Sequence, residues 1–97
     1  MGRKYLRIHE VVEICGVNET FIHRLEEEKM IRPVVQHKQK LYPMDQVDRV
    51  RVAHVLFVEM RVNIEGVEVT LHMREQMIAL QRKYEKALRR LKQQMEK

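Results

Sequence analysis

Apolar residues at helical spacing mark two short helices near the start of the chain. Residues 8–14 place their apolar side chains mainly on one side of a helix, with polar side chains between them. We expect Gly16 to end this helix, because glycine adopts a positive φ without a Cβ clash. Asn18 can cap a second helix that runs to about Lys29. Two short helices joined by a glycine-containing turn are the helix-turn-helix pattern.

The second helix has a core face and an outer face. Glu19 follows the cap in the first turn, where the helix dipole favours an anion. The spacing predicts that four residues point toward the core, namely Val17, Phe21, Ile22 and Leu25. It also predicts that three point outward, namely His23, Arg24 and Glu27.

Two short β-favouring runs follow the helix pair. Pro33 removes a backbone donor and stops helical continuation. Val34 and Val35 precede a polar turn over residues 36–39, and residues 40–42 form the second run. This pattern predicts a two-stranded wing.

Two longer helices complete the predicted chain. Pro43 suits the first turn of a helix over roughly residues 44–61. Asn63 then caps a helix that begins at Ile64 and continues toward the C-terminus. A break near Arg74 and Glu75 would allow the distal part to fold back on its own domain.

The last predicted helix has a seven-residue apolar repeat. One heptad site holds residues 70, 77, 84 and 91, and the other holds residues 73, 80, 87 and 94. A lone helix cannot bury such a stripe, so a partner helix is implied, with folding back as the alternative. We therefore predict a domain over residues 1–73 and a coiled-coil dimerisation helix over residues 74–97. The predicted dimerisation residues are Met73, Met77, Leu80, Tyr84, Ala87, Leu88 and Leu91.

The formal net charge of +5 is unevenly distributed along the 97 residues. Residues 81–97 hold seven basic and two acidic side chains, which accounts for the whole +5. Residues 1–80 are neutral, with twelve of each sign. Any DNA-binding face in the first eighty residues must therefore be local.

The order of these elements resembles the MerR family of winged helix-turn-helix regulators over about residues 5–73. Gly16, Asn18, Pro33 and Tyr42 are among the residues that carry the likeness. The stretch 62–67 is similar to that of MerR-type heat-shock repressors and of chaperone modulators. The resemblance implies a mainly α-helical winged helix-turn-helix with a small two-stranded wing and a long C-terminal helix. It also implies a transcriptional regulator that binds double-stranded DNA as a homodimer and controls heat-shock or chaperone genes.

The DNA-reading residues depart from that family's usual pattern. Ile22 and Glu26 match it, but His23 stands where the family has arginine, and Lys40 replaces an arginine of the wing. Phosphate contacts set affinity, while base contacts set sequence preference. The predicted DNA contacts are Thr20, His23, Arg24, Lys38, Lys40 and Tyr42.

The alternative function is that of a chaperone modulator which binds a J-domain co-chaperone and no longer reads DNA specifically. J-domains present a basic face, so an acidic helix would suit one electrostatically. The candidate partner-binding residues are Glu19, Glu26, Glu27 and Glu28. Any carboxylate of this helix that lies near phosphate opposes the counterion release that drives DNA binding. The basic segment 82–92 keeps a coiled-coil exterior soluble or adds nonspecific attraction to nucleic acid.

Enzymatic and metal-binding functions find little support in the sequence. The chain contains no serine, and its five histidines never pair at a spacing of three or four residues. We expect no catalysis, no cofactor and no metal. The single cysteine, Cys15, fits a buried apolar role in a reducing compartment, so we expect a cytoplasmic protein without a membrane segment.

Overall fold

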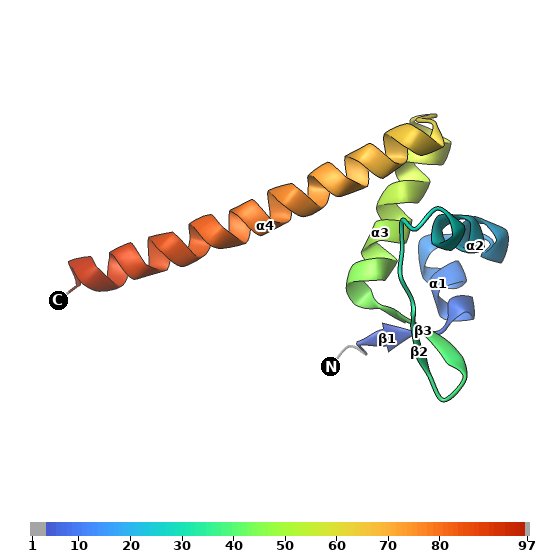
Figure 1. The fold of residues 1–97 in the computed structure, drawn as a ribbon, viewed down its shortest axis with the longest axis horizontal. Coiled ribbons are helices and arrows are strands. Elements are labelled where there is room, and N and C mark those ends of the chain that lie inside the picture. Colours follow the sequence, from blue (N-terminus) through green and yellow to red (C-terminus); the bar gives the residue numbers. More distant parts are fainter. Residues whose placement is uncertain (1–3, 97) are drawn as a thin grey trace.

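A small helical domain and one long projecting helix make up the computed structural model, which describes residues 4–96 (Figure 1). The elements are β1 Tyr5–Leu6, α1 Ile8–Cys15, α2 Glu19–Glu27, β2 Val34–Gln36, β3 Gln39–Pro43, α3 Met44–His54, the π-helix η1 Val55–Glu59, and α4 Ile64–Met95. The described part measures 55 × 34 × 19 Å, and α4 extends along its longest axis. None of the helices in this part of the chain is long and apolar enough to cross a bilayer.

The helix-turn-helix pair forms as the capping residues predict. Gly16 ends α1 in the left-handed conformation, with φ +66°. The Asn18 side chain accepts a 2.8 Å hydrogen bond from the Phe21 N–H at the start of α2. Helix α2 ends at Glu27, earlier than predicted, because Lys29 adopts a φ of +60°. The Met30 N–H then bonds the Leu25 carbonyl at 2.8 Å, which closes a Schellman-type cap.

The predicted two-stranded wing is confirmed as β2 and β3, and β1 adds a third antiparallel strand to its sheet. Strand order is β1-β3-β2, so β3 lies in the middle. Leu6 of β1 pairs with Tyr42 and is buried. The two-residue strand β1 is too short to show an alternating pattern, so the sequence did not predict it. Between β2 and β3 the turn residues His37 and Lys38 both have positive φ, as a two-residue primed turn requires.

The helix predicted over residues 44–61 differs from the observed one at both ends. Pro43 is the last residue of β3 and the N-cap of α3, and it is not in the first helical turn. The α-helix ends at His54 and continues as one π-helical segment, in which the Met60 N–H bonds the Val55 carbonyl at 3.0 Å. This wider turn changes the side-chain register. Met60, the residue that follows this segment, is 63% exposed.

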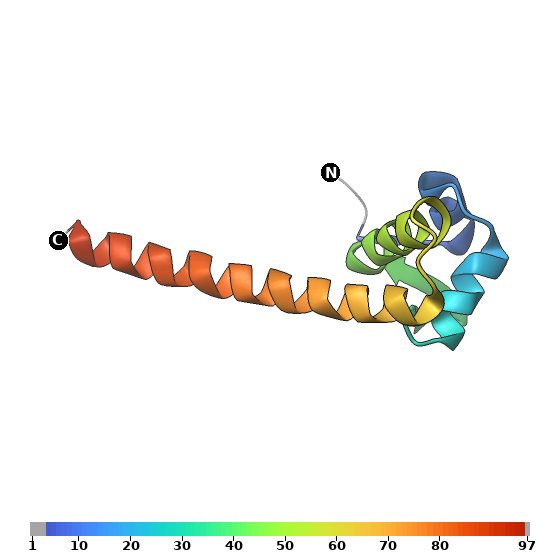
Figure 2. The ribbon, with the colours of Figure 1, turned by 90° about the horizontal axis from the view of Figure 1, so that it is seen from above.

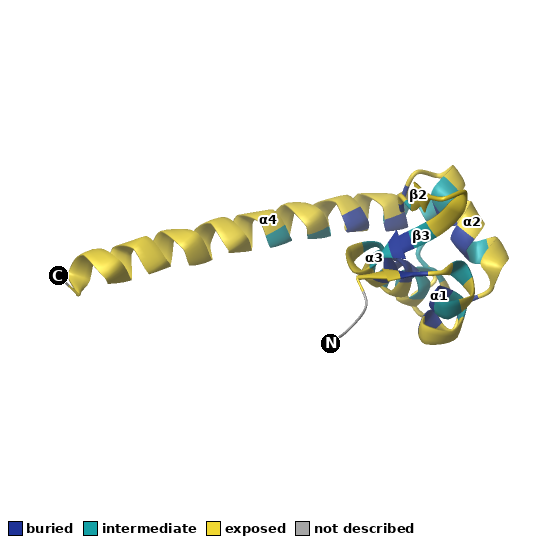
Figure 3. Cartoon of the chain, turned by 90° about the horizontal axis from the view of Figure 1, so that it is seen from below, coloured by how far each residue is buried: buried dark blue, intermediate teal, exposed yellow. Residues whose placement is uncertain are grey.

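The core lies where α1, α2, α3 and the start of α4 meet the sheet, as the buried residues in Figure 3 show. Its largest fully buried side chains include Tyr42, Ile22, Leu25, Ile31 and Leu71. Within residues 4–96, all buried residues are hydrophobic, and no polar or charged residue is buried. The hydrophobic effect therefore holds the helix pair, the wing and α4 in one unit.

Helix α4 is continuous from Ile64 to Met95, so the break considered near residues 74–75 does not occur. Its cap forms as predicted, because the Asn63 side chain accepts a 2.8 Å hydrogen bond from the Gly66 N–H. Val67 and Leu71 are buried against the domain, and Ile78 is half-buried. Every described residue from 79 to 96 is exposed, which contradicts the alternative that the helix folds back (Figure 2).

Candidate nucleic-acid interface

Helix α2 presents one exposed face, which we call the reader face. Successive residues of a helix are rotated by about 100°, so the buried Ile22 and Leu25 define the inner side. The residues of the reader face are all exposed and are Glu19, Thr20, His23, Arg24 and Glu27. The predicted outward orientation of His23, Arg24 and Glu27 is thus confirmed.

Glu26 connects α2 to the wing. One of its oxygens lies 3.0 Å from Lys40 Nζ, and the other lies 3.0 Å from His23 Nδ1. The Glu26 side chain is only 11% exposed, whereas that of Lys40 is 51% exposed. Lys40 is therefore partly neutralised within the domain. Glu26 is correspondingly unavailable to a protein partner, unlike the exposed Glu19.

Tyr42 lies in the core and not on the DNA-facing surface. Its side chain is fully buried, and its hydroxyl has no hydrogen-bond partner within residues 4–96. Burial, followed by the nearby Glu26 carboxylate, raises the pKa of the Tyr42 hydroxyl above its ordinary value. The predicted phosphate contact is corrected on this ground, because a fully buried hydroxyl cannot reach a phosphate. Lys40 and Tyr42 lie two residues apart on β3 and share one face of the strand.

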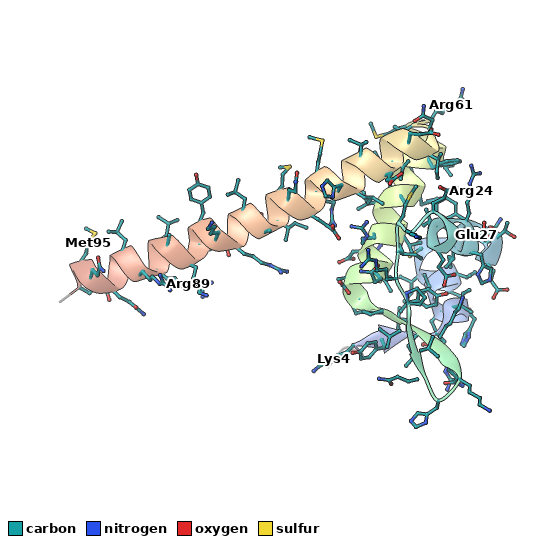
Figure 4. The ribbon with its side chains drawn as sticks, in the orientation of Figure 1. Lys4, Arg24, Glu27, Arg61, Arg89 and Met95 are labelled. Atoms are coloured by element: carbon teal, nitrogen blue, oxygen red, sulfur yellow. The ribbon has the colours of Figure 1, made fainter. Side chains whose placement is uncertain are left out.

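Arg24 occupies the edge of the reader face that is remote from the wing. Its guanidinium carbon lies 5.3 Å from the centre of the Phe57 ring, which is a cation–π distance. Phe21 contacts the same ring edge-to-face, with 6.1 Å between centroids. Arg24 therefore lies near the junction of α3 and α4, where Figure 4 labels it.

The reader face lies between Arg24 and Lys40. Around α2, Glu26 and Arg24 are separated by about 160°, on either side of the inner face. The ion pair with Glu26 places Lys40 at one edge of the reader face. Arg24, which lies against Phe57, is at the other edge. The exposed arc of α2 therefore extends from one cation to the other, across nearly half of the helix circumference.

The tip of the wing adds further positive charge. Lys38 is exposed, with a φ of +64°, and the preceding His37 is exposed with a φ of +49°. A left-handed conformation at two successive non-glycine residues is uncommon. The hairpin geometry therefore holds Lys38 at the outermost point of the wing, beyond Lys40.

Two side chains of α3 position the segment between α2 and β2, and sequence reasoning missed both. Gln46 Oε1 accepts a 2.8 Å hydrogen bond from the Arg32 N–H. Arg49 Nε donates to the Met30 carbonyl at 2.7 Å, while Arg49 Nη1 lies 2.7 Å from Glu75 of α4. Arg49 was detectable only as a basic residue at the half-buried margin of a predicted helix. Arg49 therefore connects the segment between α2 and β2 to α4.

The acidic surface predicted to bind a J-domain partner is smaller than expected, because Glu26 is paired with Lys40. Glu19, Glu27 and Glu28 are exposed, but Glu26 is not part of an open patch. Glu28 is the C-cap of α2 and lies about 100° from Glu27 around the helix axis. The predicted patch of four carboxylates is thus three separate exposed groups and one paired group.

The described residues offer few candidate groups for catalysis or metal binding. Cys15 is buried, its thiol lies 3.8 Å from the Val47 carbonyl, and burial raises its pKa by more than Arg51 lowers it. A protonated, buried thiol is a poor nucleophile. Within residues 4–96, no group of three His, Cys, Asp or Glu side chains is arranged to hold a metal ion.

The predicted dimerisation residues form an unpartnered stripe on α4. The stripe is rotated by well over 90° from Val67 and Leu71, which pack on the domain. Its exposed large side chains include Met73, Met77, Leu80, Tyr84, Leu88, Leu91 and Met95. We call these residues, with Ala87, the apolar stripe. Figure 4 shows Met95 on one side of α4 and Arg89 on the other.

Comparison with known proteins identifies a family for this chain. A family model described as "MerR HTH family regulatory protein" matches residues 6–93, which is nearly the whole chain. No curated protein and no solved structure matches significantly. The matched range includes the helix pair, the wing, α3 and most of α4.

Proposed function

The chain belongs to the MerR family of helix-turn-helix regulatory proteins, and from this we propose how it works as a DNA-binding transcriptional regulator. The reader face of α2 would enter the major groove, where helix side chains reach base edges. Arg24 at one edge and the wing cations at the other would contact flanking phosphates. The observation that carries the proposal is the position of the exposed reader face between Arg24 and the wing.

The contact residues divide by role. Thr20 and His23 lie centrally on the reader face and are proposed to contact bases. Lys38 and Arg24 are proposed to contact phosphates. Lys40 contributes less than its charge suggests, since Glu26 competes with phosphate for it. Tyr42 packs in the core beneath β3 and would make no contact with DNA.

A homodimer would present two reader faces, one for each half-site of a DNA operator. The apolar stripe on α4 exposes side chains that are large and contiguous along one side of the helix, which favours pairing with a second copy. Two neutral domains would then act on one duplex, each with few phosphate contacts. The likeness of residues 62–67 to heat-shock repressors supports heat-shock or chaperone genes as targets, and a cytoplasmic, non-catalytic regulator.

Substitution of Arg24 tests the DNA-binding proposal. Binding of a fluorescent duplex, chosen by selection from random sequences, is followed by anisotropy across a salt series. Arg24→Ala is expected to weaken binding several-fold and to make the slope of log affinity against log salt shallower by about 1, as for loss of one phosphate contact. Lys4→Ala removes an equal charge from an exposed position before β1, away from α2, and serves as the control (Figure 4). Equal responses of the two variants would reject the proposed interface.

The alternative proposal is a chaperone modulator that binds a J-domain co-chaperone through the exposed carboxylates of α2. The exposure of Glu27 and Glu28 supports it. Reversing both to lysine is expected to abolish co-purification with a J-domain protein, whereas Glu13→Lys on α1 should not. Unchanged co-purification of the reversed variant would exclude this function.

A further inference from the structure

Five cations gather on one side of the distal half of α4. They lie within the nine residues 82–90, which contain a single acid, Glu85. All five are exposed and are Arg82, Lys83, Lys86, Arg89 and Arg90. We call them the basic face.

The basic face points away from the apolar stripe. At about 100° per residue, its five members fall within about 120° around the helix axis. The centre of this arc lies nearly half a turn from the centre of the apolar stripe. Figure 4 shows the same relation, because Arg89 and Met95 project from opposite sides of α4. A second copy seated on the apolar stripe would therefore leave the basic face open to solvent.

Within residues 4–96, the charges of the basic face are not paired with acidic side chains. None of the five cations forms an ion pair with another described residue; the ion pairs of residues 4–96 involve Lys40, Arg49 and His23. The hydrophobic core ends near Leu71, so nothing in the described domain covers these side chains. Their electrostatic attraction is available to a partner.

The distribution of charge along the chain indicates the chemical class of this partner. Residues 1–80, which contain the reader face and the wing, have no net charge. The electrostatic part of binding to nucleic acid comes from cations that displace counterions from phosphate. In this chain the surplus cations lie on α4 and not on the reader.

We propose that the basic face of α4 is a second contact surface for the sugar-phosphate backbone of duplex DNA, which rests on the proposed DNA-binding function. Arg82, Lys86 and Arg90 follow one another at about 6 Å along the helix axis. A duplex carries one negative charge per about 1.7 Å, so a row of this length meets several phosphates. The basic face supplies affinity that is independent of sequence, and the reader face supplies sequence preference.

The test compares two variants of the full chain that lose the same charge. The first carries Arg82→Gln, Lys86→Gln and Arg90→Gln, on the basic face. The control carries Lys4→Gln, Arg61→Gln and Lys92→Gln, at exposed positions outside that face. Anisotropy with a random-sequence duplex is measured between 50 and 200 mM KCl, and circular dichroism checks that both variants keep their helix content.

The expected result is a change in salt dependence. Three lost phosphate contacts should make the slope of log affinity against log salt shallower by about 2 to 3 per chain, and affinity at the lowest salt should fall more than tenfold. The control should change the slope by less than half as much. Equal effects of the two variants, or tighter binding of the parent to single-stranded RNA or anionic vesicles than to duplex, would overturn the proposal.

Failure here and failure of the proposed function are distinguishable. The basic face is tested on a duplex of random sequence, whereas Arg24→Ala is tested on a selected site. A basic-face variant that binds like its control, together with a weakened Arg24→Ala variant, would overturn only the role of α4. The reverse result would leave α4 as a polyanion-binding helix and reject the proposed contact of Arg24 with DNA.

Discussion

Replacing Glu26 by glutamine should tighten DNA binding. In the folded protein, Glu26 holds Lys40 Nζ at 3.0 Å, so a phosphate must compete with a carboxylate for this cation. Glutamine keeps the size of the side chain and can still accept a hydrogen bond, but it carries no charge. Lys40 would then be free to contact the duplex from the wing.

The size of the effect follows from counterion release. One added phosphate contact steepens the slope of log affinity against log salt by about 0.9. If that contact contributes nothing at 1 M salt, affinity at 0.1 M rises about eightfold. The cost to folding should stay below about 1 kcal/mol, because Lys40 is half exposed and exposed ion pairs contribute little.

Glu27→Gln is the matched control. It removes the same charge from the reader face but releases no cation, since Glu27 is exposed and lies on the other side of His23. At about 8 Å in water one unit charge contributes about 0.5 kcal/mol, so about a twofold gain is expected. Anisotropy across the salt series measures both variants. If Glu26→Gln changes the slope no more than Glu27→Gln does, Lys40 is not a latent phosphate contact and the reasoning fails.

Three further predictions concern assembly and stability. Leu80→Glu with Leu91→Glu should convert a dimer to a monomer by light scattering, because both carboxylates enter the apolar stripe; a monomeric parent protein would contradict the pairing. Tyr42 has a raised pKa in the folded state, so its contribution to stability is complete below the unfolded pKa near 10 and is lost as the pH rises from there toward the folded pKa. Tyr42→Phe should therefore flatten the alkaline loss of stability in denaturant titrations, and an unchanged profile would rule out this origin. Gly66→Ala should fail to give the stabilisation of about 1 kcal/mol usual in a helix, since the new Cβ would lie 2.6 Å from Val62 Cγ1; adding Val62→Ala should recover part of it in thermal unfolding.

Local chemistry explains which elements were predictable. Gly16, Asn18 and Asn63 act through hydrogen bonds and backbone angles within a few residues of themselves, so the ends of α1 and the starts of α2 and α4 follow directly from the sequence. The turn at His37 and Lys38 was located correctly without glycine, because the flanking β-favouring runs indicate it. Strand β1 was missed, since its pairing partner is more than thirty residues away.

The candidate interface was predictable in part. The 3.6-residue period alone placed His23, Arg24 and Glu27 on the outside of α2. The pairing of Glu26 with Lys40 depends on how α2 packs beside β3, across a separation of fourteen residues. No spacing rule relates these two positions, so the ion pair could not be predicted. The sequence analysis therefore treated Lys40 and Glu26 as unpaired charges.

The amino-acid sequence by itself determined the helix-turn-helix, the apolar repeat of α4 and the division of charge between a neutral domain and a basic helix, because each depends on neighbours along the chain. Only the tertiary structure decided that Tyr42 is buried and that Lys40 is held by Glu26. It also decided that the apolar stripe and the basic face both remain exposed, because α4 packs on the domain only near its start, at Val67 and Leu71. Burial and ion pairing depend on contacts between distant segments, and those contacts exist only once the chain has folded.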